Sequence, residues 1–413
     1  MNRLKELEAQ VLEEGREWTR QRLKSQMQAH ANEFESICPQ NGCLLKYRQT
    51  RALTLETCVG AITIQVTSGY SKALKRRVHP VRAAWNLAPH QRISPELQDR
   101  LAYTATQTNS YQKASKLAKR WGTPISDDTV HAVVQRMGEA AEAIELPPPQ
   151  GLKREEFSLV IMMDGWMVRR RGANWGADKR QHAAERVEWK EIKSAVIYRL
   201  ETRTANASGR GLLVEKFVVA SPPETSPLDF GAAVQAEALR RGLVQARQVY
   251  VVIDGAVWLW NLAKDRFSEA DLLLDFHHAS QHLWALANQL HGQGSIEART
   301  WAEGLLHSLR HGGEAQVVRT LEELLIPKTP LAEPAPESLC GPVEYFRTHR
   351  DHLHYQRNAE QGAPVGSGSV ESLCSQLQNR FKRTGQFWTP DGLRRLLKLD
   401  VLNRNDDFNC LWN

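Results

Sequence analysis

Hydrophobic and polar residues near the start of the chain are spaced as in a helix. Five apolar residues fall on one side of a helix between residues 4 and 34, and charged residues occupy most other positions. These apolar residues are Leu4, Leu7, Val11, Trp18 and Met27. The pattern predicts an amphipathic N-terminal helix in residues 1–36, which packs against another element or self-associates.

The pattern then changes to the period of two that is typical of strands. Apolar and polar residues alternate at residues 52–55 and 61–66, and Gly60 lies between the two runs. Residues 37–92 are therefore predicted to form a small β module. Cys38 and Cys43 resemble one knuckle of a zinc ribbon. No second cysteine pair follows to complete four ligands, so the module is expected to be degenerate. This favours a module without zinc, but Cys38 and Cys43 stay candidate zinc ligands, and the sequence leaves open whether the module binds zinc.

Helical spacing returns in the next segment of the chain. The predicted helices span residues 95–108, 110–122 and 126–144. Gly122 ends the second helix, and Ser126 or Asp127 is the expected N-cap of the third. Residues 93–146 thus have a helix-turn-helix-like outline, which occurs in DNA-binding proteins and in proteins that bind no DNA. The proline-rich residues 147–151 mark a linker to a second domain.

The second domain opens with a buried-strand pattern at residues 157–163 that ends at Asp164. Further strands are predicted at residues 188–200, 212–220, 248–253 and 272–275, with a helix at residues 230–241 before the last two. Three strands, a helix and a strand form the order in which an RNase H-like sheet begins. Helical patterns then dominate to residue 357, interrupted by a proline-containing loop from Pro327 to Pro342.

These patterns divide the rest of the chain into three parts. Residues 152–290 are predicted to be the first part of an RNase H-like α/β catalytic core, 291–362 an all-helical insertion, and 363–413 the C-terminal helix and tail of the core.

Composition adds a preference for a polyanionic partner. The 413 residues include 54 Lys and Arg against 47 Asp and Glu, which gives a net charge of +7. The six cysteines are scattered rather than arranged as a disulfide framework, which indicates a reducing compartment. No apolar run approaches the length of a membrane span. A cytoplasmic protein without membrane contact is therefore expected.

Three acidic residues are candidates for chemistry. Asp164 and Asp254 each follow a predicted strand and precede glycine, which suits a carboxylate aimed from a rigid strand but is also a common turn pair. Glu371 lies where a glycine-serine loop runs into a helix, beside an apolar stripe. Taken alone, Glu371 has the pattern of a solvated glutamate on a basic surface helix. Together, the three acids could hold two divalent ions for phosphoryl transfer on DNA, and their hard oxygen ligands favour Mg²⁺ or Mn²⁺.

The sequence resembles the ISKra-type insertion-sequence transposases and, more broadly, the Mutator- and hAT-like DDE enzymes. The resemblance rests on Met-Asp164-Gly, on Val-Ile-Asp254-Gly-Ala, on the segment from Leu274 to His278, and on the segment from Val365 to Trp388. It implies that Asp164, Asp254 and Glu371 are the catalytic triad and hold two Mg²⁺ or Mn²⁺ ions. It also places Asp275 and His278 near the active site. From sequence alone, Asp275 is equally an N-cap and His278 a partly buried surface residue.

Basic and aromatic residues are candidates for DNA contacts, since arginines hold phosphates and aromatic faces stack unpaired bases. These residues are Arg169, Arg170, Arg171, Arg380, Lys382, Arg383 and Trp388. Most tryptophans belong to the core, and Trp388 is singled out because its segment is polar.

The resulting hypothesis is a transposase that binds the terminal inverted repeats of an insertion sequence as a homo-oligomer in a synaptic complex. It would cleave DNA strands and join them to target DNA. Two alternatives remain open: an RNase H-like nuclease or resolvase that cuts without joining, and a transposase-derived DNA-binding regulator without catalysis.

Overall fold

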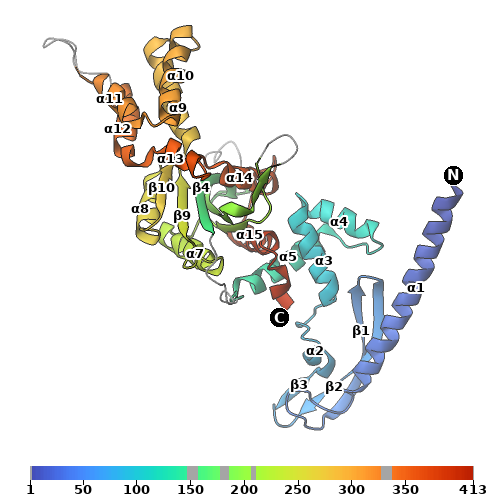
Figure 1. Ribbon diagram of the computed structural model, residues 1–413. Coiled ribbons are helices and arrows are strands. Elements are labelled where there is room, and N and C mark those ends of the chain that lie inside the picture. The colour runs from blue at the N-terminus through green and yellow to red at the C-terminus, as the bar shows by residue number, and fades with distance from the viewer. Residues whose placement is uncertain (1, 147–156, 177–185, 206–210, 327–336, 413) are drawn as a thin grey trace. The chain divides into compact units, whose positions relative to one another are not determined.

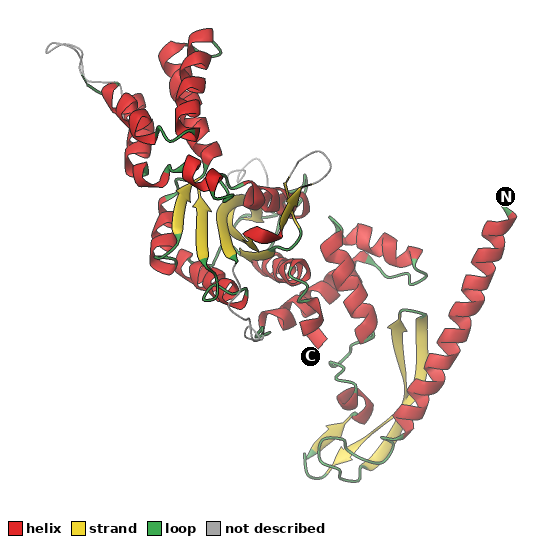
Figure 2. Cartoon of the chain, viewed as in Figure 1, coloured by secondary structure: helices red, strands yellow, loops and turns green. Residues whose placement is uncertain are grey.

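The computed structural model describes residues 2–146, 157–176, 186–205, 211–326 and 337–412. The chain forms two compact units, Met1–Met137 and Gly138–Asn413, and each is described by itself. Figure 1 labels their elements and Figure 2 distinguishes helices from strands. The predicted linker at 147–151 lies outside the described residues.

The first unit begins with the long helix α1 (Arg3–Asn32), whose N-cap Asn2 accepts a hydrogen bond from the Leu4 backbone N–H. The C-terminal half of α1 packs on the neighbouring sheet through Leu23, Met27 and Ala31. Most of the apolar positions predicted to bury one face, among them Leu4 and Trp18, are instead exposed in its N-terminal half. The amphipathic pattern therefore corresponds to packing along only half of this helix.

A three-stranded antiparallel sheet follows in the order β1-β2-β3. Its strands are β1 (Lys46–Thr57), β2 (Gly60–Ser71) and β3 (Arg76–Val78), followed by the short helix α2 (Pro80–Ala84). Gly60 begins β2 with a φ of 105°, which a residue with a Cβ rarely adopts, so the predicted turn glycine has a steric reason. Leu53 and Leu55 alternate with exposed residues and pack with Ile62 and Ile64.

The cysteine pair lies in a tight turn before this sheet. The Cys38 backbone N–H donates to the Cys43 carbonyl at 3.0 Å, and the Gly42 N–H donates to the Cys38 carbonyl at 2.8 Å. Cys38 is fully buried against Leu45 and Val78, whereas Cys43 is exposed. Within the described part of the chain, neither cysteine belongs to a group of three potential metal ligands.

Three helices complete this region, namely α3 (Pro95–Gln107), α4 (Tyr111–Arg120) and α5 (Asp127–Glu142), as predicted. Gly122 ends the turn after α4 with a φ of 88°. The Ser126 hydroxyl accepts a hydrogen bond from the Thr129 N–H at 3.2 Å, so Ser126 rather than Asp127 caps α5.

The second unit is a mixed α/β structure with a five-stranded sheet in the order β10-β9-β4-β5-β8. The strands are β4 (Ser158–Arg171), β5 (Val187–Arg199), β8 (Phe217–Ser221), β9 (Gln248–Ile253) and β10 (Asp271–Leu274). Strands β4, β9 and β10 are parallel to one another, whereas β5 pairs antiparallel with both β4 and β8. The central strand β4 is buried from Ser158 to Met163, which explains its continuous apolar run.

Two strand predictions were wrong in their bounds. Strand β4 does not end at Asp164 but continues to Arg171, because its pairing with β5 extends from Leu159 to Arg171 while its parallel pairing with β9 stops at Met163. The strand expected at 212–220 is two strands. The short β7 (Gly211–Leu213) pairs with β6 (Arg203–Ala205) in a separate hairpin, and only β8 joins the main sheet.

Several helices pack against this sheet. Those with the main contacts are α7 (Pro227–Arg240), α8 (Val257–Arg266), α14 (Gly368–Phe381) and α15 (Pro390–Arg404). Helix α14 contacts β4 and β5, α15 and α7 contact β8, and α8 contacts β9.

A helical region separates β10 from α14 in the sequence. Its helices are α9 (Phe276–His291), α10 (Ile296–Arg310), α11 (Glu314–Glu323), α12 (Glu337–Thr348) and α13 (Tyr355–Glu360). Figure 1 shows α9 to α12 extending away from the sheet beyond the ends of β9 and β10. Most of the loop predicted from Pro327 to Pro342 lies outside the described residues, and the prediction was wrong at its end, because α12 begins at Glu337 and contains Pro342.

Candidate active site

The strand register brings three aspartates to one edge of the sheet. The last parallel pairs are Met163 with Ile253 between β4 and β9, and Ile253 with Leu274 between β9 and β10. The next residues along the three chains are Asp164, Asp254 and Asp275. Because parallel strands run in the same direction, these aspartates follow the last pair at the same edge, where α/β sheets commonly bind their ligands.

Asp164 is half-buried on β4, opposite Ser194 of β5. Its Oδ1 accepts a hydrogen bond from the Gly165 N–H at 2.6 Å, and the Cys374 thiol of α14 hydrogen-bonds to the same carboxylate. Burial raises the pKa of Asp164 above its ordinary value, and the negative charge of Asp254 adds to this effect. The two carboxylates therefore act on each other electrostatically.

Asp254 follows β9 and is held by the turn into α8. Its Oδ1 accepts from the Ala256 N–H at 2.8 Å, and its carbonyl oxygen accepts from the Trp260 indole N–H at 2.7 Å. Tyr345 of α12 lies directly against Gly255, where a Cβ would collide with the phenol ring. Gly255 thus leaves room for a side chain of the helical region.

Glu371 lies in the first turn of α14, and its carboxylate is fixed by the residue that precedes this helix. The Ser367 hydroxyl donates to Glu371 Oε1 at 2.8 Å. The Ser367 backbone N–H donates to Asp275 Oδ1 at 2.7 Å, so the start of α14 is tied to the end of β10. Two hydrogen bonds, from Ser367 to Glu371 and from Ser367 to Asp275, therefore connect Glu371 to the carboxyl end of β10.

Asp275 is the N-cap of α9 and is fully buried. Its Oδ2 accepts from the His278 backbone N–H at 2.9 Å and is 2.7 Å from His278 Nδ1. Burial opposes ionisation, but the hydrogen bonds from His278 and Ser367 outweigh it and hold the pKa of Asp275 below its ordinary value. The hydrogen bond to Asp275 raises the pKa of His278, with further contributions from Asp254 and Asp164.

The structure brings three of the predicted site residues close together. Potential metal-ligating atoms of Asp275, His278 and Glu371 lie within 4.8 Å of one another. Asp164 and Asp254 are not members of any such group of three among the described residues. Asp275 and His278, which the sequence placed near the active site, are thus the immediate neighbours of Glu371.

The predicted DNA-contacting arginines of β4 make contacts within the protein. The Arg169 guanidinium donates to the carbonyls of Lys382 and Arg383, Arg170 pairs with Glu224, and the Arg171 Nε donates to the Phe387 carbonyl at 3.2 Å. These bonds fix the segment that follows α14 along the edge of β4.

Two other predicted DNA contacts are buried, which argues against that prediction. Trp388 is 9% exposed, and its indole N–H donates to the Phe381 carbonyl at 2.7 Å. Arg380 is 4% exposed and lies near the Phe381 and Trp388 rings. The polar sequence around Trp388 suggested an exposed ring. In the structure the ring is covered, and its indole N–H donates to a backbone carbonyl instead of to water.

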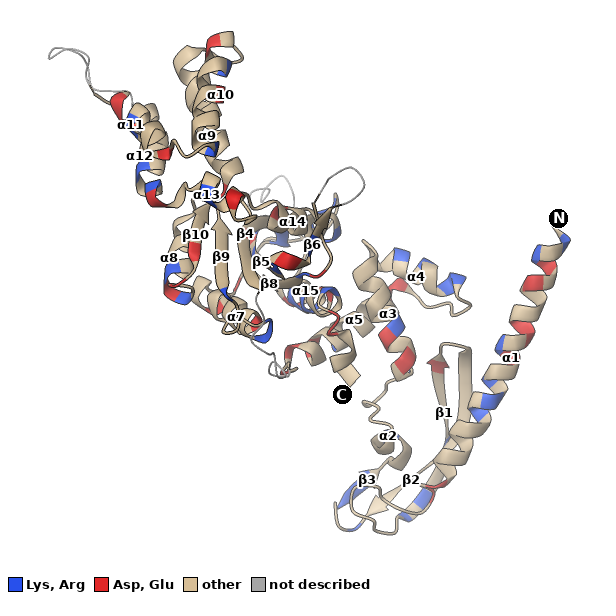
Figure 3. Ribbon diagram, in the orientation of Figure 1, with Lys and Arg blue, Asp and Glu red and all other residues tan. Residues whose placement is uncertain are grey.

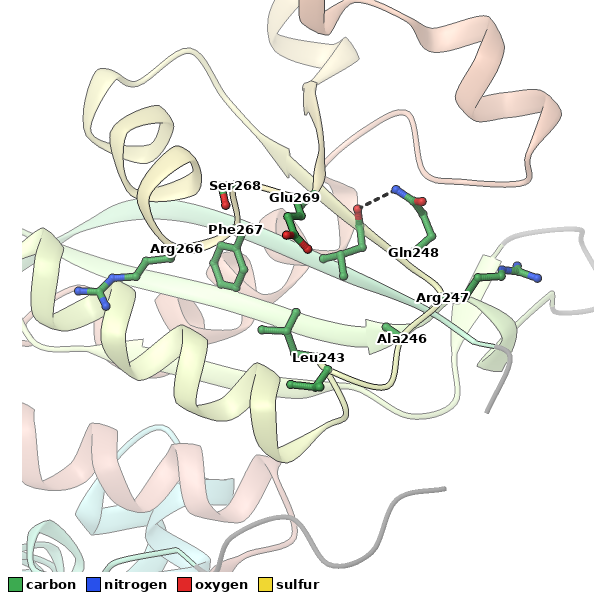
Figure 4. Close-up of a pocket in the computed structure, with 11 residues that line it drawn as sticks. Leu243, Ala246, Arg247, Gln248, Arg266, Phe267, Ser268 and Glu269 are labelled. Atoms are coloured by element: carbon green, nitrogen blue, oxygen red, sulfur yellow. Dashed lines mark hydrogen bonds between the residues drawn. The ribbon is translucent and has the colours of Figure 1, made fainter. Parts of the chain in front are cut away.

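Two cavities flank the sheet at different places. A pocket of about 410 Å³ lies beside the amino-terminal end of β9, lined by residues such as Leu243, Gln248 and Phe267, and is shown in Figure 4. It is at the opposite end of the strand from Asp254. A groove of about 720 Å³ follows the start of α14 and is lined by Ser369, Ser372, Arg203 and Lys216, among other residues.

Several residues that the sequence analysis did not select take part in these arrangements. Ser367, Cys374 and Tyr345 contact the acidic residues or their neighbours. The serine and the cysteine could have been found because they lie four residues before Glu371 and three after it, on the same turns of a helix. The contact with Tyr345 is between distant parts of the chain and leaves no local signal.

A basic face in the first unit was also not selected. Helix α4 exposes four basic residues, Lys113, Lys116, Lys119 and Arg120, and buries Ala114 and Ala118 on its other side (Figure 3). Their three-residue spacing in the sequence is the signal that could have identified this face.

The chain matches the profile of the Uncharacterised protein family (UPF0236) over residues 2–407. The chain belongs to the UPF0236 family. A curated relative is the UPF0236 protein in vanSb 3'region of Streptococcus gallolyticus, which is 22% identical over 348 residues, or 81% of this chain and 68% of the relative.

Among solved structures, the UPF0236 chain is similar to the Drosophila P element transposase strand transfer complex at 11% sequence identity and a TM-score of 0.35. The similarity covers 75% of this chain and 92% of that one. A TM-score at this level does not establish a common fold. Within the described residues, no helix has both the length and the apolar character needed to cross a membrane.

Proposed function

We propose that this UPF0236 protein is a DDE transposase that cleaves DNA strands and transfers them, with Asp164, Asp254 and Glu371 as its catalytic acids. The observation that supports this most is the placement of Asp164 and Asp254 after the last pairs of adjacent parallel strands. Glu371 is tied to the same edge through Ser367 and Asp275. Carboxylates from two strands and one helix, held on rigid elements, are suited to phosphoryl transfer.

The topology of the sheet supports an RNase H-like interpretation of the second unit. Three consecutive antiparallel strands, β4, β5 and β8, are followed by α7 and then by the parallel strands β9 and β10. The helical region between β10 and α14 would be the insertion that the sequence pattern predicts.

The donor chemistry of the edge fits a divalent cation. Asp164, Asp254 and Glu371 have no Lys or Arg within salt-bridge distance among the described residues, and their hydrogen-bond donors are backbone N–H, hydroxyl and thiol groups. Hard carboxylate oxygens favour Mg²⁺ or Mn²⁺. When bound, such ions would stabilise the negative charge that develops on the attacking and leaving oxygens. The carboxylates would hold them, and Ser367 would orient Glu371.

DNA would be bound by basic surfaces on both units. The exposed basic face of α4 is suited to phosphate contacts, and in the second unit Arg171 and Arg383 are exposed, with Lys382 half-buried beside them. The groove along α14 is lined by Arg203 and Lys216. We propose that the first unit recognises the terminal inverted repeats and that two or more copies bring the ends together.

Cleavage and joining of a labelled DNA that carries the element ends, with Mg²⁺, would test this function. The wild type should give cleaved and joined products, whereas Asp164→Asn and Glu371→Gln should bind the same DNA and lose product formation by a factor on the order of 10³ or more. A matched control is Glu344→Gln on the exposed surface of α12. Cleavage without joined product would indicate a nuclease or resolvase, and binding without metal-dependent product a regulator.

A further inference from the structure

Asp275 is the most constrained carboxylate at the acidic edge. It is 0% exposed and accepts three hydrogen bonds, from the Ser367 N–H to Oδ1 and from the His278 N–H and Nδ1 to Oδ2. Gly366 adds to this confinement, since a Cβ there would approach Asp275 Oδ1 to 3.2 Å. Both oxygens already accept protein donors and the side chain is fully buried, which suits Asp275 to hold its neighbours in place.

The same carboxylate determines which nitrogen of His278 is available. Asp275 Oδ2 accepts the His278 backbone N–H and lies 2.7 Å from His278 Nδ1, an arrangement that a proton on Nδ1 satisfies. In the neutral ring, the lone pair is then on Nε2, which has no hydrogen-bond partner within the described part of the chain. The His278 side chain is 33% exposed, so Nε2 is not sealed in the core.

Glu371 offers a second ligand atom at the same place. Ser367 occupies Oε1 and leaves Oε2 without a described hydrogen-bond partner. One ring nitrogen of His278 and a carboxylate oxygen from each of Asp275 and Glu371 lie within 4.8 Å of one another. The imidazole and the Glu371 carboxylate are therefore close neighbours. An ion shared by the two would bind the ring nitrogen that does not face Asp275.

We propose that His278 Nε2 and the Glu371 carboxylate bind one divalent cation, and that Asp275 is the residue that positions both of them. Asp275 orients the imidazole through Nδ1 and holds the start of α14 through Ser367. A carboxylate behind a metal-ligating histidine is a common arrangement that fixes the ring and its tautomer. This inference rests on the proposed function, because Glu371 belongs to both sites.

A mixed nitrogen and oxygen donor set has a consequence for metal choice. Imidazole nitrogen is a poorer ligand for Mg²⁺ than for Mn²⁺ and later transition metals. The His278–Glu371 pair should therefore select Mn²⁺ over Mg²⁺, whereas a site of three carboxylates would accept either ion.

Binding of Mn²⁺ to the full-length protein, followed by pulsed electron paramagnetic resonance, tests the proposal without DNA cleavage. The wild type should show coupling of the bound Mn²⁺ to an imidazole nitrogen, and the coupling should change when histidine is labelled with ¹⁵N. His278→Gln should abolish it. His277→Gln is the matched control, because His277 is the adjacent residue on α9 and bonds to Gln281 instead.

Asp275→Asn separates positioning from ligation. Asparagine has a single acceptor oxygen, so if it keeps the bond from the Ser367 N–H, its amide N–H₂ faces the His278 backbone N–H and Nδ1, and the ring proton moves to Nε2. We expect loss of the nitrogen coupling and a 10- to 100-fold weaker Mn²⁺ affinity. The melting temperature without metal should also fall, because the cap bond of α9 is lost. Wild-type spectra without a histidine coupling, or a coupling that persists in His278→Gln, would overturn the proposal.

The two proposals fail in different ways. If the nitrogen coupling depends on His278 but no DNA is cleaved or joined, the metal site stands and the transposase function does not. If DNA is processed and His278→Gln leaves Mn²⁺ binding unchanged, the function stands and this site is wrong. Should His278→Gln misfold, His278→Ala serves the same comparison.

Discussion

Two groups of acidic residues in the second unit are stabilised in opposite ways. Glu237, which is 6% exposed, pairs with Arg240 at 2.8 Å and with Arg241 at 2.7 Å, and Asp407 pairs with Arg240 at 3.2 Å. At the strand edge, Asp164, Asp254 and Glu371 have no Lys or Arg within 4.0 Å among the described residues. Their hydrogen bonds come from the Gly165 and Ala256 N–H groups, the Ser367 hydroxyl and the Cys374 thiol.

This difference indicates what each group does. A buried carboxylate that is paired with arginine contributes to the fold, because removal of either partner leaves an unpaired charge. Carboxylates that repel each other and lack cations do not stabilise the fold, and burial already raises the pKa of Asp164. Hydrogen bonds from uncharged donors orient the carboxylate oxygens without cancelling their negative charge. This contrast supports the proposal that the edge binds a cation, whereas the Glu237 cluster already contains its own cationic partners.

The largest expected effect on stability comes from the paired group. Glu237→Gln keeps the shape of the side chain but removes the charge that Arg240 and Arg241 share, and should lower the free energy of unfolding by roughly 3 kcal/mol. Glu371→Gln should change it by less than about 0.5 kcal/mol. Urea unfolding of the two variants measures this contrast. Equal losses in both would show that the acids at the edge are also structural.

A third arrangement of titratable groups occurs in the helical region, where histidines are buried in the neutral form. Burial lowers the pKa of His349 to about 4, and the neighbouring His352, Lys264 and His282 contribute in the same direction. His349 also packs against Trp260 and Tyr345.

The pH dependence of stability should reveal this neutral group. The unfolded chain takes up a proton near pH 6.5 and the folded chain only near pH 4, so the stability from His349 is complete above pH 6.5 and decreases as pH falls. The loss at pH 5 should be about 2 kcal/mol. Urea unfolding at pH 7.5 and pH 5 should show this loss in the wild type but not in His349→Gln. Identical pH slopes for the two proteins would contradict it.

Much of the fold could be predicted from local patterns. The alternation at residues 52–55 and 61–66 predicted the β1–β2 hairpin, and apolar runs predicted β9 and β10 within one residue. The carboxyl ends of β9 and β10 could be located because Asp254 and Asp275 directly follow strands whose pattern is continuous and buried.

What the sequence did not predict depends on contacts between distant segments. Asp164 was placed at a strand end because the buried apolar run stops at Met163, yet antiparallel pairing with β5 extends β4 to Arg171. The hydrogen bond between Ser367 and Asp275 joins residues 92 positions apart, and no local sequence period indicates such a contact. Similarly, the polar segment around Trp388 gave no sign that this ring fills the space beside Phe381 and Arg380.

The smallest expected effect concerns Trp388, which follows α14 in the sequence and packs against Phe381. Trp388→Phe retains the ring in the core but removes the indole N–H bond to the Phe381 carbonyl, and should lower the free energy of unfolding by about 1 kcal/mol. Its DNA affinity should be unchanged, because a residue that is 9% exposed presents no stacking face. Fluorescence anisotropy with single-stranded DNA checks this, with Arg383→Gln as the exposed comparison. A several-fold weaker affinity for Trp388→Phe would mean that the segment opens to bind DNA and that the core position is only one of its states.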